Sequence, residues 1–303
     1  MFGLLNLNKP VGISSAAVLG RIKRLVRPAK IGHAGTLDPI ASGVLVACIG
    51  PATRLVDFVQ RMPKAYRATF LLGRSSESDD IERPVTELPN PPIPARDEIE
   101  RVAAAFVGPI EQRPPAFSAL KIAGRPAYEL ARRGREVNLP PRTVEIHRLH
   151  VAVYDYPELV LEIQCGSGTY VRALGRDLAE SLGTAAVMSE LDRTAIGDFR
   201  VEESCGPDQI NSETLRQCLL SPRLAIPALP TIQLNDDEVQ LAVNGIVVPP
   251  RCDAIDGADG QEFAGVDSHG ELVSIFRLRA DGALAPRLNF RRAGGLARRA
   301  EGV

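Results

Sequence analysis

The order in which strand-like and helix-like segments follow one another narrows the folds open to this chain. Apolar, β-branched runs predict strands, and apolar residues at helical spacing predict helices. The strand-like runs lie at residues 4–10, 44–50, 66–73, 143–156 and 159–166, and the helical spacing at 14–26, 53–62, 96–108, 125–134, 169–183 and 211–220. Because the two kinds alternate irregularly and do not form a strict β-α-β series, the sequence predicts an α+β fold with a mixed or antiparallel sheet.

The composition changes near residue 230. Residues 231–290 are short strand-like pieces broken by glycine and aspartate, a pattern typical of a small β-barrel. The length of 303 residues also exceeds what one core usually supports. We expect a large domain at residues 1–230, a small barrel at 231–290 and a disordered tail at 291–303. Residues 74–95, rich in Ser, Pro and acidic side chains, are expected to form a loop outside the core.

Positive charge is concentrated in two blocks, although the net charge is only -1. Residues 1–73 contain ten Lys and Arg against two Asp and Glu, and residues 112–150 contain eight against three. The other segments are acidic. If the two blocks share one face, they form an electropositive surface for a phosphate backbone; charges that are merely solvated are the alternative.

Several classes of protein are disfavoured by the sequence. No apolar run reaches the roughly 18 residues that span a bilayer, and the N-terminus lacks the features of a signal peptide, so we expect a cytoplasmic protein. The five cysteines are widely spaced without a CxxC pair, which argues against disulfides and a zinc site. His147 and His150 have a ligand-like spacing, but positions three apart on a strand point to opposite faces, so no metal is expected.

The segment most suggestive of chemistry is GHAGTLDPIASGVL, residues 32–45. It combines flexible glycines, the polar His33, and Asp38 followed directly by a proline, just before a predicted strand. An Asp-Pro pair by itself more often marks a turn than a catalytic site, because aspartate bonds to nearby backbone and proline fixes φ. The surrounding residues therefore have to decide between these two interpretations.

Five blocks in order along residues 4–200 resemble the TruB-type family of tRNA pseudouridine synthases. GTLDPIASGVL matches the family pattern GxLDPxAxGxL at every fixed position. The other similar blocks are LNLNKPVGISS, KAYRATFLLG, RPPAFSALKIAGRPAYELARRG and CGSGTYVRALGRDLAESLG. Departures from the family pattern are Phe117 in place of tyrosine, Ser76 and Ser78 in place of threonines, and Pro126 in place of a basic residue. These departures concern substrate loops more than the catalytic block.

The resemblance implies conversion of the T-loop uridine of tRNA, position 55, to pseudouridine on a base flipped out of the RNA. Asp38 would be the nucleophile; whether it attacks the base or the sugar, or first helps to deprotonate C2′, stays open. Arg172 would keep Asp38 ionised, with its guanidinium holding both carboxylate oxygens. Tyr66 would stack on the flipped base and is a candidate general base. No cofactor is expected, because side chains alone can carry the isomerisation.

The same resemblance implies a set of substrate contacts. Tyr170 and Leu191 would line the pocket, His33 would occupy space in the T loop, and Lys9 would lie near the active site and support the region of Tyr66. Asp80 matches an acidic residue of a mobile loop in the family. Candidate phosphate contacts are the basic residues Arg21, Lys23, Arg24, Lys30, Lys121, Arg132 and Arg142.

Residues 231–290 loosely resemble the PUA-type RNA-binding barrel. The implied partner is the T arm of tRNA, with no protein partner, and we expect a monomer. Two alternatives stay open: an RNA-binding protein without catalysis, and a nucleoside hydrolase that uses Asp38 with a second acid. The first gives no reason for an intact Asp38, Tyr66 and Arg172, and the second lacks a convincing second carboxylate motif.

Overall fold

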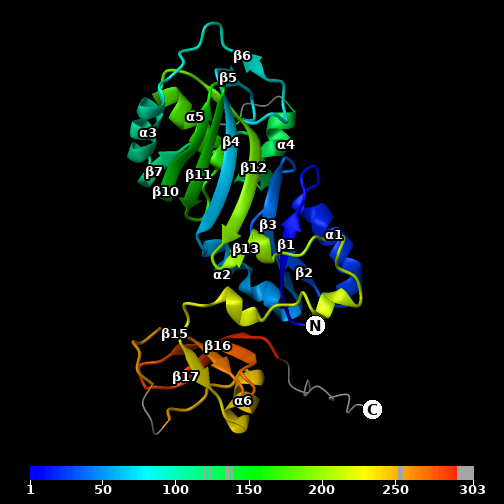
Figure 1. The fold of residues 1–303 in the computed structure, drawn as a ribbon. Coiled ribbons are helices and arrows are strands. Elements are labelled where there is room, and N and C mark those ends of the chain that lie inside the picture. The colour runs from blue at the N-terminus through cyan, green and yellow to red at the C-terminus, as the bar shows by residue number, and fades with distance from the viewer. Residues whose placement is uncertain (119, 123, 134–136, 138, 252–254, 292–303) are drawn as a thin grey trace.

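A computed structural model describes residues 1–118, 120–122, 124–133, 137, 139–251 and 255–291 (Figure 1). Its main feature is a nine-stranded sheet with the path β1-β3-β12-β4-β11-β10-β7, in which β2 also pairs with β3 and β13 with β12. The strands are β1 (Gly3–Lys9), β2 (Ile31–His33), β3 (Ala41–Ile49), β4 (Lys64–Leu72), β7 (Gly108–Gln112), β10 (Arg142–Asp155), β11 (Glu158–Cys165), β12 (Ala186–Ile196) and β13 (Phe199–Arg200). Only β12 and β3 run parallel in this sheet, so the sheet is mixed.

Helices cover the sheet and bury its apolar side chains. They are α1 (Ser15–Val26), α2 (Val56–Arg61), α3 (Arg96–Ala105), α4 (Ala127–Arg132) and α5 (Val171–Ser181), with short 3-10 helices η1 (Gly50–Leu55), η2 (Val201–Glu203), η3 (Thr214–Arg216) and η4 (Pro222–Ala225). The Ser14 side chain caps α1 by accepting the amide hydrogen of Ala17. Helix α1 packs on β1 and β3, whereas α3 and α5 pack on the half of the sheet that contains β4, β10 and β12.

A second sheet follows residue 230, at the end of the large sheet where β1 begins (Figure 1). It has the order β14-β15-β16-β17, with bounds β14 (Thr231–Gln233), β15 (Glu262–Val266), β16 (Leu272–Leu278) and β17 (Leu284–Asn289). Its apolar residues share a buried cluster with the large part, and the Phe2 and Phe290 rings stack with centroids 5.4 Å apart. The predicted α+β class, a mixed sheet with a small C-terminal β unit, is thus confirmed.

The structure differs from the sequence predictions in several elements. Strand β12, an interior strand of the sheet between β3 and β4, was not predicted, nor was α6 (Asp236–Val243). The helix predicted at 211–220 is reduced to the 3-10 turn η3, and the predicted loop at 30–43 contains β2. The predicted domain limits at 230 and 290 remain predictions, and the tail lies outside the described residues except for Arg291. In the described part of the chain, no helix is long and apolar enough to cross a membrane.

The prediction that residues 74–95 lie outside the core is wrong for part of that segment. The hairpin of β5 (Arg74–Ser75) and β6 (Thr86–Glu87) is at the surface, but the turn between its strands folds back onto β12. The amide of Ile81 donates to the Met188 carbonyl, and Asp80 is fully buried. A buried acid of this kind requires a cationic partner, and the site below supplies one.

Candidate functional site

The loop that carries Asp38 is fixed to the first helix. The hydroxyl of Ser15 accepts the amide hydrogen of Leu37 at 2.9 Å and lies 3.1 Å from the Leu37 carbonyl, to which it donates. Gly35, with φ +98°, supplies the left-handed conformation at the start of the turn. The amide of Ala41 then donates to the carbonyl of Asp38, and β3 begins. These contacts fix the backbone on both sides of the carboxylate.

Lys9 also stabilises the loop that carries Asp38. Its side chain is fully buried, and its ammonium donates to the carbonyls of Pro10, Pro39 and Ala41 at 2.9, 3.3 and 2.5 Å. Burial lowers the pKa of Lys9 to about 8, and the nearby Asp38 carboxylate opposes that change. Lys9 lines neither of the two cavities beside Asp38. In the structure Lys9 therefore supports the loop, and its predicted substrate contact stays a prediction.

Arg172, in the first turn of α5, lies between two carboxylates. Its Nη2 is 3.1 Å from Oδ2 of Asp38, and its Nη1 is 3.0 Å from Oδ2 of Asp80. The carbonyls of Ser78 and Phe117 accept further hydrogen bonds at 2.9 and 3.1 Å. The expected grip on both oxygens of Asp38 is thus wrong, because the second arm of the guanidinium is occupied by Asp80.

The two carboxylates differ in environment. Asp80 is completely buried and also accepts from the Ser78 hydroxyl at 2.5 Å and the Glu82 amide at 3.0 Å. The Asp38 side chain remains 36% exposed and faces open space. Desolvation raises the pKa of Asp38, Arg172 lowers it, and the negative charge of Asp80 raises it again. Asp80 therefore holds Arg172, while Asp38 is the acid that a substrate can reach.

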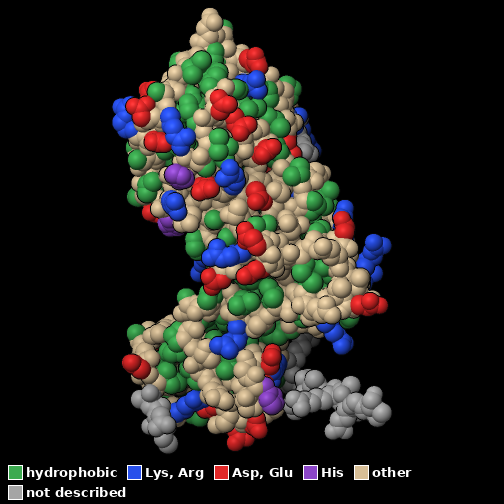
Figure 2. All heavy atoms as spheres, viewed as in Figure 1, with side chains coloured by type: hydrophobic (Ala, Val, Ile, Leu, Met, Phe, Trp, Pro, Cys, Tyr) green, Lys and Arg blue, Asp and Glu red, His purple; other side chains and the backbone are tan. Residues whose placement is uncertain are grey.

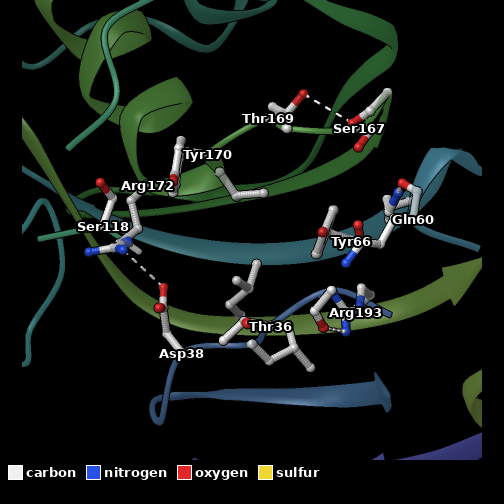
Figure 3. A pocket seen from close by; sticks show the side chains of 17 residues that line it. Thr36, Asp38, Gln60, Tyr66, Ser118, Ser167, Thr169, Tyr170, Arg172 and Arg193 are labelled. Carbon is white, nitrogen blue, oxygen red and sulfur yellow. Dashed lines mark hydrogen bonds and ion pairs between the residues drawn. The ribbon is translucent and has the colours of Figure 1, made fainter. Parts of the chain in front are cut away.

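A cavity of about 270 Å³ opens beside Asp38 (Figure 3). This lies near the lower end of the roughly 300–1,000 Å³ typical of ligand pockets, which suits a single nucleotide. Its wall includes Asp38, Tyr66, Tyr170, Arg172 and Leu191, five of the seven predicted site residues. A second opening, about 750 Å³, shares Asp38 and Arg172 with the first. The pair of Asp38 and Arg172 thus stands where the two openings meet.

The wall residues are held by their neighbours. The buried Gln112 side chain accepts from the Tyr170 amide at 2.8 Å and donates to the Tyr170 carbonyl at 3.1 Å. Arg142, predicted as a phosphate contact, lies 4.9 Å from the Tyr170 ring centroid and donates to the carbonyl of Gly168. Leu191 lies on β12, opposite Ala68 of β4. The aromatic and apolar wall is thus built on fixed elements.

His33 is not part of this wall. It lies on β2, half-buried, with a buried Nδ1 that has no hydrogen-bond partner among the described residues. Desolvation, reinforced by the charge of Arg193, lowers its pKa, so the neutral imidazole is favoured. Its predicted RNA contact stays a prediction.

The polar residues of the cavity that sequence reasoning did not name as site residues include Gln60, Lys64 and Arg193. Lys64 is 7% exposed, and burial lowers its pKa to about 8. Arg193 is 2% exposed. No sequence signal set Arg193 apart, because Glu190, Asp192 and Thr194 beside it are also polar and typical of a surface.

The predicted phosphate contacts have limited support in the structure. His147 and His150 are both exposed on β10, and the described residues contain no group of His, Cys, Asp or Glu suited to a metal. Arg21 pairs with Asp208 at 2.5 Å, and the side chains of Lys121 and Arg132 lie outside the described part. Figure 2 shows Lys and Arg interspersed with Asp and Glu over the face in view. The electropositive face stays a prediction.

Comparison with known proteins agrees with this geometry. Residues 23–171 match the model of the TruB family pseudouridylate synthase N-terminal domain. The chain is 36% identical over 294 residues to "tRNA pseudouridine synthase B" of Caulobacter sp. (strain K31), with 94% of each chain covered. It is 35% identical over 303 residues to the protein of that name from Acaryochloris marina, covering 95% of this chain and 98% of the relative.

The fold agrees with a solved structure as well. A chain of the crystal structure of a Cbf5-Nop10-Gar1 complex superposes with a TM-score of 0.70 at 26% identity, covering 96% of this chain and 85% of that one. The sequence relatives extend over nearly the whole chain, and the family model includes both Asp38 and Tyr66. This chain therefore belongs to the TruB family of pseudouridylate synthases.

Proposed function

We propose that this enzyme converts the uridine at position 55, in the T loop of tRNA, to pseudouridine, with Asp38 as the nucleophile. The observation that carries the proposal is the pair of Asp38 and Arg172 at the mouth of a nucleotide-sized cavity. The names of the relatives support tRNA as the substrate. A purely RNA-binding protein would give no reason for this buried ion network, because burying charges costs free energy.

The reaction breaks the bond between N1 of uracil and C1′ of the ribose and re-attaches the base through C5. Attack by the Asp38 carboxylate at the sugar or the base would provide a covalent intermediate while the base rotates. The hydrogen on C5 must then leave as a proton, and Tyr66 is the candidate base for it. Arg172 keeps Asp38 charged and directed, since it contacts the carboxylate at 3.1 Å. The product has the same atoms as the substrate, so no redox partner is consumed.

The cavity can accept the target base only if the base leaves the stacked T loop. Extruding a base costs a few kcal/mol, which contacts in the pocket must offset. Tyr66 and Tyr170 offer aromatic faces, and stacking on an aromatic side chain contributes about 1–3 kcal/mol per base. The C-terminal sheet is proposed to bind RNA outside the T loop. The cytoplasmic location and the monomeric state remain predictions.

The test is incubation of purified enzyme with an unmodified tRNA transcript, followed by chemical mapping of pseudouridine. We expect one pseudouridine at position 55 and none in a transcript with cytidine at that position. Asp38→Asn, which keeps the shape of the side chain, should bind the transcript and form no product. Free uracil would identify a hydrolase, and binding without product a non-catalytic RNA-binding protein. Product at another position would refute the site specificity.

A further inference from the structure

Arg193 is a buried cation to which the proposed reaction gives no role. It is among the largest fully buried side chains of the described residues, and it lies on β12. Its Nε donates to the carbonyl of Val44 at 2.7 Å, and its Nη2 donates to the carbonyl of Gly35 at 3.1 Å. In the part of the chain that the structure describes, no carboxylate forms an ion pair with it. A guanidinium has five N–H donors, so further donor capacity remains for a group in the cavity.

The sheet register places Tyr66 directly opposite this cation. Arg193 of β12 and Tyr66 of β4 are antiparallel Cα partners. Directly opposed residues project from the same face of a sheet with Cβ atoms about 4.5–5.5 Å apart. Both side chains line the cavity, and Figure 3 shows them at the same end of it, away from Asp38. Their proximity therefore follows from the backbone pairing.

The groups around the Tyr66 phenol determine whether its oxygen can carry a negative charge. Desolvation raises the pKa of Tyr66, and the positive charge of Arg193 opposes that rise. The other charged or titratable groups that act on the phenol are Cys165 of β11 and Asp38, and both raise the pKa further. Arg193 is thus the group that favours negative charge on this oxygen.

We propose that Arg193 is a positioning residue that donates a hydrogen bond to the phenolic oxygen of Tyr66 and holds the ring against the flipped base. Two donors of the guanidinium are anchored to β3 and to the loop before Asp38, so the donor aimed at Tyr66 is fixed relative to the nucleophile. Its catalytic consequence rests on the proposed function, but the contact itself does not. The alternative is that Arg193 only ties the strands together, in which case Tyr66 would not sense its charge.

The contact can be tested without RNA by replacing the five tyrosines with a fluorinated tyrosine of lower intrinsic pKa and titrating the protein by ¹⁹F NMR. Tyr66→Phe identifies the Tyr66 signal. In Arg193→Gln we expect the acid dissociation constant of Tyr66 to fall at least about tenfold, because a desolvated phenolate loses its cation. The matched control is Arg67→Gln, which removes a cation from the next residue of β4. Arg67 points to the opposite face and pairs with Glu162, so the Tyr66 signal should titrate as in the parent protein.

Melting curves establish which variants fold. If Arg193→Gln does not fold, ¹⁵N NMR of the arginine side chains in Tyr66→Phe replaces it: loss of the phenol should shift the Arg193 resonances. An unchanged Tyr66 titration in folded Arg193→Gln, or unchanged Arg193 resonances in Tyr66→Phe, would overturn the contact while leaving the proposed function intact.

The catalytic consequence has a separate readout. The single-turnover rate of Arg193→Lys should fall less than that of Arg193→Gln, because lysine keeps the charge. For both variants, the pH at which the single-turnover rate rises on the alkaline side should shift together with the Tyr66 titration. If the rates fall while the titration is unchanged, Arg193 acts on the substrate directly and the proposed contact is refuted. If the unmutated enzyme makes no pseudouridine while the titration shifts, the proposed function fails and the contact stands.

Discussion

Arg172→Lys should remove most of the catalytic rate while conserving the charge. In the structure, Arg172 bonds to Asp38 through Nη2, to Asp80 through Nη1, and to two backbone carbonyls. A lysine has one nitrogen and cannot occupy both positions. If the lysine ammonium pairs with the fully buried Asp80, Asp38 is left without a cationic partner. A misplacement of about 1 Å can cost on the order of a hundredfold in rate, which is about 2.7 kcal/mol of activation free energy.

The assay is the single-turnover rate at saturating tRNA, with the dissociation constant measured separately. The matched control is Arg176→Lys, one turn further along α5. Arg176 also pairs with an acid, Asp79, at 2.7 Å, and Asp79 is the neighbour of Asp80 in the loop between β5 and β6. Arg176 does not line the cavity. This control should lose some stability and keep its rate. If Arg172→Lys keeps its single-turnover rate and only weakens tRNA binding, Arg172 is a contact to the RNA backbone, and its role in directing Asp38 must be abandoned.

Three further outcomes follow from the site. The single-turnover rate should fall in acid with an apparent pKa above that of an ordinary aspartate, because desolvation raises the pKa of Asp38 and only its ionised form can attack; an acid limb at or below the ordinary value would contradict this. The rate should be unchanged in EDTA, and loss of activity restored by one metal would refute catalysis by side chains alone. The affinity for tRNA should fall steeply with salt, because each neutralised phosphate releases counterions; a flat dependence would remove the basis for the proposed basic face.

The pairing of Asp38 with Arg172 could be predicted from the sequence because the two residues lie in separate but specific blocks. Asp38 and Arg172 are far apart along the chain, and only the resemblance to the family predicted that they pair. In the structure they form an ion pair at 3.1 Å. Asp80 was harder to interpret, because SESDD has the composition of a solvated loop. Its burial depends on how that loop pairs with β12, a strand that the sequence analysis did not predict.

Strand β12 was missed because Glu190, Asp192 and Arg193 interrupt its apolar pattern. Charged residues normally mark a surface, whereas this strand lies inside the sheet and carries Leu191 and Arg193 into the cavity. Helix α6 was missed for a different reason, since it is short and weakly amphipathic. Its signal was nevertheless present: Asn235 followed three residues later by Glu238 forms a capping box in the structure. Register-dependent neighbours, such as Arg193 opposite Tyr66, cannot be predicted without the strand pairing.

Helix α5, which carries Arg172, packs closely on β4, which carries Tyr66. The variant Gly175→Ala tests how much this close packing contributes to stability and rate. A Cβ at Gly175 would lie 1.9 Å from Cε1 of Phe70, a fully buried ring on β4. Helix propensity alone would favour alanine by roughly 0.8–1 kcal/mol, but overpacking typically costs about 1–3 kcal/mol. We therefore expect a lower melting temperature, together with a lower single-turnover rate, because α5 carries Arg172 and β4 carries Tyr66. Phe70→Leu should restore stability in the Gly175→Ala background while destabilising the parent protein. If Gly175→Ala melts at or above the parent temperature, the helix propensity of alanine outweighs the clash with Phe70, and the argument from close packing of α5 on β4 is refuted.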